Sequence, residues 1–332
     1  MATYNPKYTV AIIARDSMQY DVTPAITKLT LQENDGEIAQ RVTITMSNLK
    51  VNNSYLSAIF GVGDRVFVYG NDGNQKEEVF RGFVWTDNGA TNKSKSLTLT
   101  CYDNLIYFME SEEYQFFSAG YSTKSICEAL CEAWSIGLSY RYDSITHPKL
   151  PLRGNLADIF LSDLLDEVKK KTGAKYIMRS EKDTVVIDFV GCNTTVYKLT
   201  KGKNGNAIEA SSETTMQGMV TKVVILGKED DNERAAVEDI VEGNTSEYGT
   251  LQKILNVSSG TTLEEVKQEA EELIHEKGNP KTTYSVTSVN VPWVRKGDKV
   301  EVNAGDLSGD FIVKSITHYG SDKTMTLEVE KA

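Results

Sequence analysis

The chain has 332 residues, of which 40% are hydrophobic and 25% are charged, and its formal net charge is −11 at pH 7. This length allows two to four domains with sizeable cores. No apolar run approaches the roughly 20 residues that a membrane-spanning helix needs, and the acidic balance disfavours a general nucleic-acid binder, which would carry a clustered basic face. The first residues show no secretion signal, so we expect synthesis and folding in the cytoplasm.

The first third of the chain is predicted to be a β region. Apolar residues alternate with polar ones in six short segments, which are separated by turns rich in glycine. The predicted strands are 9–13, 25–32, 41–46, 63–68, 80–85 and 95–100. Six short strands of this kind favour a small barrel or sandwich.

The pattern changes between residues 118 and 195. A helix is predicted from the N-cap Ser122 to Gly137, with apolar residues on one face. A second helix is predicted over 156–172 and stops at Gly173, and a hairpin follows over 175–189. These elements indicate a compact α+β insert.

The remaining chain returns to strands. The clearest strand is 219–226, and the stretch 229–260 is acidic and is expected to be a loop. Thr262 and Glu265 form a capping box that predicts a helix to about Lys277. Because 283–330 supplies only about four strands, we expect 213–227 to complete a second barrel.

One short β segment occurs twice. Gly63-Asp64-Arg65-Val66-Phe67-Val68 near the N-terminus matches Gly297-Asp298-Lys299-Val300-Glu301-Val302 near the C-terminus. Each is followed by two further strands, 80–85 and 95–100 after the first, 309–313 and 323–328 after the second. Two copies of one β-module suggest a ring-building protein rather than an enzyme with one pocket.

We therefore expect an α+β fold that is mainly β, with two similar small β-barrel domains. The first β-barrel domain is expected over 1–115 and the α+β insert over 116–195. The second β-barrel domain is expected over 196–228 plus 283–332, interrupted by a loop and helix insertion over 229–282.

The residues that could carry chemistry are scattered. His147, His275 and His318 fall in different predicted segments, and a structural or interface role is expected for His318. Cys127 and Cys131 are interpreted as buried thiols on a helix rather than metal ligands. Cys101 and Cys192 are expected in the core.

The remaining candidates have simple structural readings. Gly61-Val62-Gly63 and Thr200–Asn206 lack the residues that complete a nucleotide-binding loop, so both are predicted to be turns. The acidic run Glu229–Glu233 lacks the spacing of a calcium loop. Asp64 and Asp298 are interpreted as turn formers. We therefore predict no catalytic, cofactor-binding or metal-binding residue and no cofactor.

Three stretches carry a resemblance to a known family. They are Ser96–Phe108 with the helix pattern Thr123–Cys131, Tyr248–Lys253, and Val294–Val300 through Gly309–His318 to Met325–Leu327. In these stretches the chain resembles the baseplate hub proteins of contractile phage tails and phage-tail-like bacteriocins, in particular the hub family of PBSX-type prophages, which is similar to the T4-type central hub.

The resemblance implies a trimer with two similar β-barrels in each subunit and no catalytic site in these domains. The implied role is a structural adaptor between a sixfold tail tube, or its initiator protein, and a threefold central spike, in contact with other baseplate proteins. It also implies a protein made in the bacterial cytoplasm that becomes part of a tail particle, without a membrane anchor or sequence-specific nucleic-acid binding. The alternatives are a tail-associated cell-wall hydrolase and a carbohydrate-binding tail module, which surface tyrosines would support.

Overall fold

A computed structural model describes residues 5–88, 95–229, 235–257 and 261–332. The chain divides into two compact units. The first comprises residues 1–210 and 285–332, and the second comprises Ser211–Tyr284. Thirteen of the described strands form one continuous, largely antiparallel sheet, which belongs to the first unit except for the ends of β16 (Ala207–Thr215) and β20 (Lys281–Val289).

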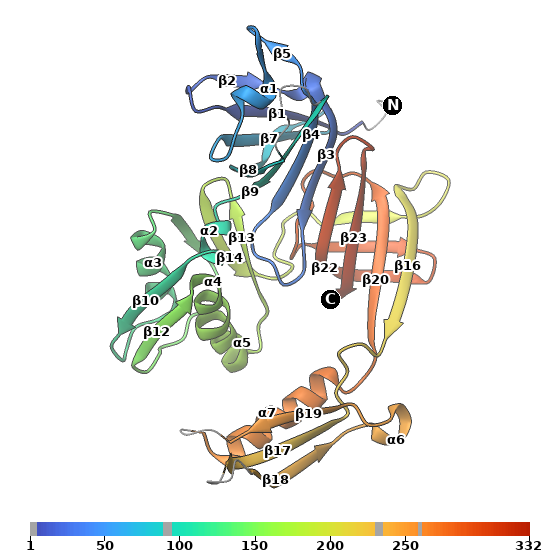
Figure 1. The fold of residues 1–332 in the computed structure, drawn as a ribbon. Coiled ribbons are helices and arrows are strands. Elements are labelled where there is room, and N and C mark those ends of the chain that lie inside the picture. The colour runs from blue at the N-terminus through green and yellow to red at the C-terminus, as the bar shows by residue number, and fades with distance from the viewer. Residues whose placement is uncertain (1–4, 89–94, 230–234, 258–260) are drawn as a thin grey trace. The chain divides into compact units, whose positions relative to one another are not determined.

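The first module of this sheet lies in the N-terminal third (blue to green in Figure 1). Its order is β3-β4-β9-β8-β7-β1, and its core contains Val42, Ile44, Leu97 and Leu99. The strands are β1 (Lys7–Ile13), β3 (Ile26–Glu33), β4 (Arg41–Ser47), β7 (Arg65–Asn71), β8 (Lys76–Asp87) and β9 (Ser96–Tyr102). Short accessory elements are β2 (Gln19–Asp21), a 3-10 turn (Thr23–Ala25), β5 (Lys50–Val51), β6 (Ser54–Tyr55) and α1 (Leu56–Ile59). All six predicted strands of this region are confirmed.

The second module repeats this arrangement near the C-terminus. Its order is β16-β20-β23-β22-β21-β15. The strands are β15 (Tyr197–Thr200), β16 (Ala207–Thr215), β20 (Lys281–Val289), β21 (Lys299–Ala304), β22 (Leu307–Tyr319) and β23 (Thr324–Lys331). Both modules therefore place their six strands in the same chain order and the same sheet order. They differ at the last pair, because β1 runs antiparallel to β7 whereas β15 runs parallel to β21.

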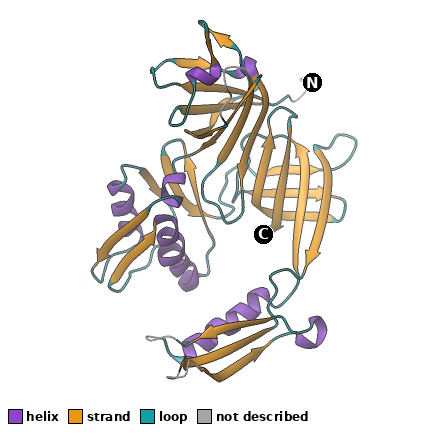
Figure 2. Ribbon diagram, in the orientation of Figure 1, coloured by secondary structure: helices purple, strands orange, loops and turns teal. Residues whose placement is uncertain are grey.

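The insert connects the two modules, and Figure 2 shows several of the chain's helices there. Its core contains Phe108, Ile126, Leu130 and Phe160, all fully buried. The elements are α2 (Ile106–Met109), β10 (Glu112–Phe117), α3 (Thr123–Ala133), β11 (Gly137–Tyr140), β12 (Leu150–Asn155), α4 (Leu156–Asp158), a π-helical stretch (Ile159–Leu165), α5 (Asp166–Thr172), β13 (Tyr176–Glu181) and β14 (Thr184–Phe189).

Both helices of the insert and its hairpin are confirmed, with one change of boundary. Ser122 caps α3 through a capping box with Ser125, as its sequence position indicates. The helix ends at Ala133 rather than Gly137, because Ser135 adopts a positive φ of 54° and Gly137 begins β11. Gly173, with φ of 74°, ends α5 as predicted.

The second unit is a small α/β layer with its own core. Its elements are β17 (Lys222–Glu229), β18 (Ala235–Glu242), α6 (Thr245–Tyr248), β19 (Gln252–Asn256) and α7 (Leu263–Lys277). β17 pairs with β18 and β19, and Val223 and Ile225 pack against Val266 and Ala270 of α7. The capped helix is confirmed, including the hydrogen bond that the Glu265 N–H donates to the Thr262 hydroxyl.

Two expectations about this region were wrong. Of the stretch 213–227 that was expected to complete the second module, only 213–215 do so, in β16, because β17 pairs with β18 and β19 and its apolar face is covered by α7. The stretch 229–260 is not a loop, because β18, α6 and β19 lie within it. The second unit interrupts the connection between β16 and β20, which corresponds to the short turn between β3 and β4.

Candidate interaction site

The two Gly-Asp motifs form the same turn. Asp64 Oδ2 accepts a hydrogen bond from the Gly61 N–H at 2.8 Å, and Asp298 Oδ2 accepts one from the Arg295 N–H at 2.9 Å. The intervening glycines, Gly63 and Gly297, have φ of 91° and 87°, a conformation that favours glycine. The two aspartates therefore do form turns, as the repeated motif predicts.

Further hydrogen bonds match between the modules. In each module the N–H of the turn glycine donates to a carbonyl of the fifth strand in chain order, β8 or β22. A threonine pair joins the third and sixth strands, and an asparagine N–H donates to a lysine carbonyl. The matched bonds are Gly63–Val84 (2.8 Å) and Gly297–Val313 (2.9 Å), Thr45–Thr98 (3.2 Å) and Thr287–Thr326 (3.1 Å), and Asn48–Lys95 (3.0 Å) and Asn290–Lys323 (2.9 Å). The repeat in the sequence is thus a structural duplication.

The surroundings of the two aspartates differ. Arg179, on β13 of the insert, donates to Asp298 Oδ1 at 2.9 Å. Asp64 Oδ1 is buried and has no hydrogen-bond partner among the described residues. Burial raises the pKa of both carboxyl groups above the ordinary value.

A buried ion pair joins the two modules. Glu33, at the end of β3, accepts hydrogen bonds from the Arg295 side chain and from the Lys296 N–H, the latter at 2.6 Å. Burial disfavours the charged carboxylate, but the positive charges of Arg295 and Lys296 outweigh that effect and lower the pKa of Glu33. The Lys296 ammonium donates to the Asn34 carbonyl at 3.0 Å. These contacts of Arg295 and Lys296 therefore bind the second module to the β3–β4 hairpin of the first.

A second buried carboxyl group lies close to this ion pair in the fold. Asp103 follows β9, and its two oxygens accept the N–H groups of Gln40 and Leu105, each at 3.0 Å. Burial raises the pKa of Asp103 to about 7 despite these two bonds. Asp103 and Arg295 both line a polar cavity of about 340 Å³.

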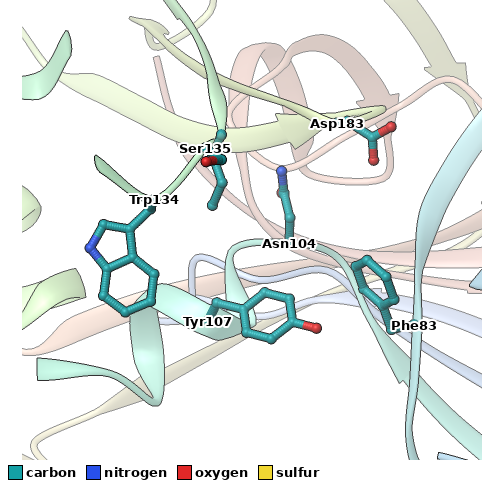
Figure 3. A pocket seen from close by; sticks show the side chains of 7 residues that line it. Phe83, Asn104, Tyr107, Trp134, Ser135 and Asp183 are labelled. Atoms are coloured by element: carbon teal, nitrogen blue, oxygen red, sulfur yellow. The ribbon is translucent and has the colours of Figure 1, made fainter. Parts of the chain in front are cut away.

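An aromatic pocket of about 350 Å³ lies between the first module and the insert. In Figure 3, Tyr107, Trp134 and Phe83 form its walls, and Asp183 lies at its upper edge. Tyr107 and Phe83 meet edge to face at 5.7 Å. Asn104 lines the pocket with a buried side-chain oxygen that has no partner among the described residues. Aromatic faces beside an amide and a carboxylate can hold a sugar or a basic side chain.

The histidines do not come together. His318 is 2% exposed, and its ring contacts the Asn290 side chain at 2.6 Å and the Val294 carbonyl at 3.0 Å. Burial lowers the pKa of His318 to about 4, so it is neutral at pH 7. His147 is buried against the Thr123 hydroxyl at 2.8 Å, and His275 is exposed on α7. The structural role expected for His318 is thus supported by its buried contacts.

Three of the four cysteine predictions are confirmed. Cys101, Cys127 and Cys131 are buried, and burial raises the pKa of each thiol. Cys192 is exposed, contrary to expectation, because it lies in the turn after β14 rather than in a strand.

Within the described ranges, no group of three His, Cys, Asp or Glu side chains could hold a metal ion. No helix in the described part of the chain is long and apolar enough to cross a membrane. The acidic run Glu229–Glu233 lies almost wholly outside the described residues.

The charged cluster around Glu33 was missed by sequence reasoning. Its residues are far apart in the chain, and Glu33 lies at the end of an alternating strand that gives no sign of a charged partner. Val294-Arg295-Lys296 before the second Gly-Asp turn was the one available signal, since no basic residues precede the first turn at Gly61-Val62.

Comparison with known protein families shows which family this chain belongs to. Residues 30–330 match the profile of the family described as YQBQ-like. The chain belongs to the YQBQ-like family. No curated protein matches this YQBQ-like chain.

Two solved structures with the same fold are tail proteins. The 43 kDa tail protein of prophage MuSo2 from Shewanella oneidensis is 16% identical, with a TM-score of 0.69 and 98% of each chain covered. The tail protein from Neisseria meningitidis MC58 is 13% identical, with a TM-score of 0.67, over 98% of this chain and 97% of that one.

A secretion-system protein also has this fold. The E. coli c3393 protein, a component of the type VI secretion system described as similar to the T4 tail proteins gp27 and gp5, is 9% identical, with a TM-score of 0.53, over 93% of this chain and 74% of that one. The YQBQ-like chain thus has the fold of phage tail proteins, and the resemblance noted in the sequence is confirmed.

Proposed function

We propose that the chain is a structural subunit of the baseplate hub of a contractile phage tail or tail-like bacteriocin. In this role three copies join a sixfold tail tube, or its initiator protein, to a threefold central spike and contact other baseplate proteins. Each module is proposed to close as a small barrel around its own core. The protein is made in the bacterial cytoplasm and then becomes part of the particle.

The observation that carries this proposal is the duplicated six-stranded module. Two modules with the same strand order and matching turn bonds give a trimer six similar units. Such a ring can match sixfold symmetry on one face while its three inserts follow threefold symmetry. The fold shared with prophage tail proteins supports the same role. We propose no catalytic function, because the buried Glu33 pairs with Arg295 across the joint between the modules and His147, His275 and His318 lie apart.

Electron cryomicroscopy of tail particles that contain the chain tests this role. The expected result is three copies on the tail axis between tube and spike. Light scattering of the purified chain with and without its spike adds the mass of the complex, which should be that of a trimer with spike bound. A chain found only at the periphery of the particle would contradict the proposal.

The aromatic pocket supports a second candidate, a carbohydrate-binding tail module. Its three aromatic walls and the unpaired Asn104 oxygen are features of sugar sites. Binding of purified cell-wall glycans that is lost in Trp134→Ala would favour this function. No binding on a glycan array would dismiss it.

A further inference from the structure

The two modules of one chain are joined edge to edge. The end of β3 in the first module pairs antiparallel with the end of β22 in the second, with Thr30 opposite Tyr319 and Glu33 opposite Ile316. Thr30 and Glu33 are buried at this joint, each less than 10% exposed, and Leu31 between them belongs to the core of the first module. Strand edges carry unpaired backbone groups, so this pairing satisfies both edges at once.

Both strands of the joint have a counterpart in the other module. By strand order, β3 corresponds to β16, and β22 corresponds to β8. β16 is the outermost strand of the sheet, and one of its edges has no partner among the described strands. β8 pairs with β7 as far as Phe83, and Val84 bonds to the turn at Gly63 and Asp64. Beyond Val84, only β9 pairs with β8 in the described part of the chain.

Exposure distinguishes the two members of each pair. The contact between the Thr214 and Thr282 hydroxyls (3.0 Å) sets the register of β16 and makes Ser211–Thr214 the counterparts of Thr30–Glu33. All four residues of Ser211–Thr214, where β16 enters the second unit, are exposed, whereas their counterparts Thr30 and Glu33 are buried. Among the described strands, β16 thus has an open edge where β3 is covered by β22.

We propose that the edge of β16 pairs antiparallel with the end of β8 in a second copy of this chain. The contact repeats, between chains, the joint that β3 and β22 make within one. It is a heterologous contact, so it closes into a ring when the rotation between modules is right. The inference rests on the proposed hub function and names the surfaces that hold the hub together.

The register of the β3–β22 joint within a chain (the inner joint) predicts the register of the proposed β16–β8 contact between chains (the outer joint). Gln32 lies opposite Thr317, so their counterparts Glu213 and Asn88 are expected to face each other. Glu33 lies opposite Ile316, so Thr214 is expected to face Asp87, whose buried Oδ1 has no partner among the described residues. A hydroxyl can donate to such a carboxylate oxygen.

The outer joint lacks the ion pair of the inner one. Thr214 replaces Glu33, and Gly61 and Val62 replace Arg295 and Lys296. Since strand pairing remains without the buried charges, the contact between chains is expected to be weaker than the contact within a chain. Assembly is then expected to need a high concentration of chain or a tube or spike partner.

Cysteine cross-linking tests the proposed pairing. In a Cys192→Ser background, Glu213→Cys is combined with Asn88→Cys in one chain, because opposite residues of paired strands lie within disulfide reach. Assembled particles are oxidised and separated without reductant. The expected result is covalent dimers and trimers and no larger species.

Two controls make the result specific. Glu209→Cys with Asn88→Cys should give little product, because Glu209 lies four residues along β16, about 13 Å away. Co-expression of the two single-cysteine chains, with tags of different size, should give mixed dimers, which proves a bond between chains.

The outcomes separate the pairing from the hub function. If the chain stands in threefold positions on the tail axis but the 213–88 pair links no better than the 209–88 control, the pairing is wrong and the hub function stands. If the chain is absent from the axis, the hub function itself fails.

Discussion

At the scale of single residues, the duplication supplies matched pairs of sites in one molecule. Gly63 and Gly297 have the same backbone conformation at the same turn. Their surroundings differ, since a Cβ at Gly63 would meet nothing within 4 Å, whereas one at Gly297 would lie 2.7 Å from Ile177 of the insert. The turn at Gly63 therefore has open space beside the glycine, whereas the turn at Gly297 packs against β13.

Alanine substitutions at these two glycines should therefore differ in cost. Gly63→Ala is expected to lower the free energy of unfolding by about 1–2 kcal/mol, the cost of a positive φ. Gly297→Ala adds the clash with Ile177 and should cost more, and Ile177→Ala should recover part of the difference. Chemical denaturation of the single and double variants measures this. Equal costs at the two glycines would contradict the asymmetry.

Asp103 predicts a dependence of stability on pH. Its pKa is about 7 in the folded chain, whereas an unfolded aspartate has a pKa of about 4. Between these values the folded chain binds the proton more tightly, so the contribution of Asp103 to stability falls as pH rises from 4 to 7, by up to about 1.4 kcal/mol per pH unit.

Comparison with Asp103→Asn isolates this contribution. The difference in unfolding free energy between the native chain and the variant should shrink steadily across this pH range, because asparagine does not titrate. Denaturation curves at four pH values between 4 and 7 provide the measurement. A difference that stays constant would show that Asp103 titrates as an ordinary aspartate.

At the scale of elements, sequence periodicity predicts most strands and helices, but it does not predict which element each of them packs against or pairs with. The alternating segments, the capping boxes at Ser122 and Thr262 and the stop at Gly173 are encoded locally, and the structure has them. The apolar run at 219–226 identifies a buried strand, yet any apolar layer could cover it, and α7 does. The exposed Val237, Ile240 and Ile254 weaken the alternation in the region that was expected to be a loop.

The pairing of β3 with β22 could not be predicted from the sequence for the same reason. Pairing between strands almost 300 residues apart leaves no local pattern, and the charged residues that lock it look like surface residues in the sequence. The Gly-Asp turns could be predicted because a turn needs only four neighbouring residues. Their different surroundings could not, since Arg179 and Ile177 come from the insert.

Loss of Glu33 should weaken this joint strongly. Glu33→Ala leaves Arg295 buried without its partner and is expected to cost about 3–5 kcal/mol of unfolding free energy. The matched control is Glu301→Ala, which removes the exposed pair with Lys198 and should cost less than about 1 kcal/mol. Both are measured by denaturation at one pH. A cost for Glu33→Ala as small as that of the control would mean that strand pairing alone holds the modules.

At the scale of the whole molecule, the chain is built from one module used twice, with different additions. The first module leads into the insert, which supplies Arg179 and Ile177 to the second Gly-Asp turn. The second module carries the second unit between β16 and β20, where the first has the short turn 34–40. The modules can thus stay alike while the additions provide surfaces for unlike neighbours.

The second unit should therefore be removable. Its buried residues Val220, Val223 and Ile225 pack against Val266 and Ala270 of the same unit, so they contribute nothing to the cores of the modules. Replacing residues 216–280 by the turn 34–40 should leave the unfolding temperature of the first unit nearly unchanged, because a β16–β20 hairpin then closes as β3–β4 does. Calorimetry of both chains measures this. Loss of a cooperative transition in the shortened chain would mean that the second module needs the inserted unit to fold.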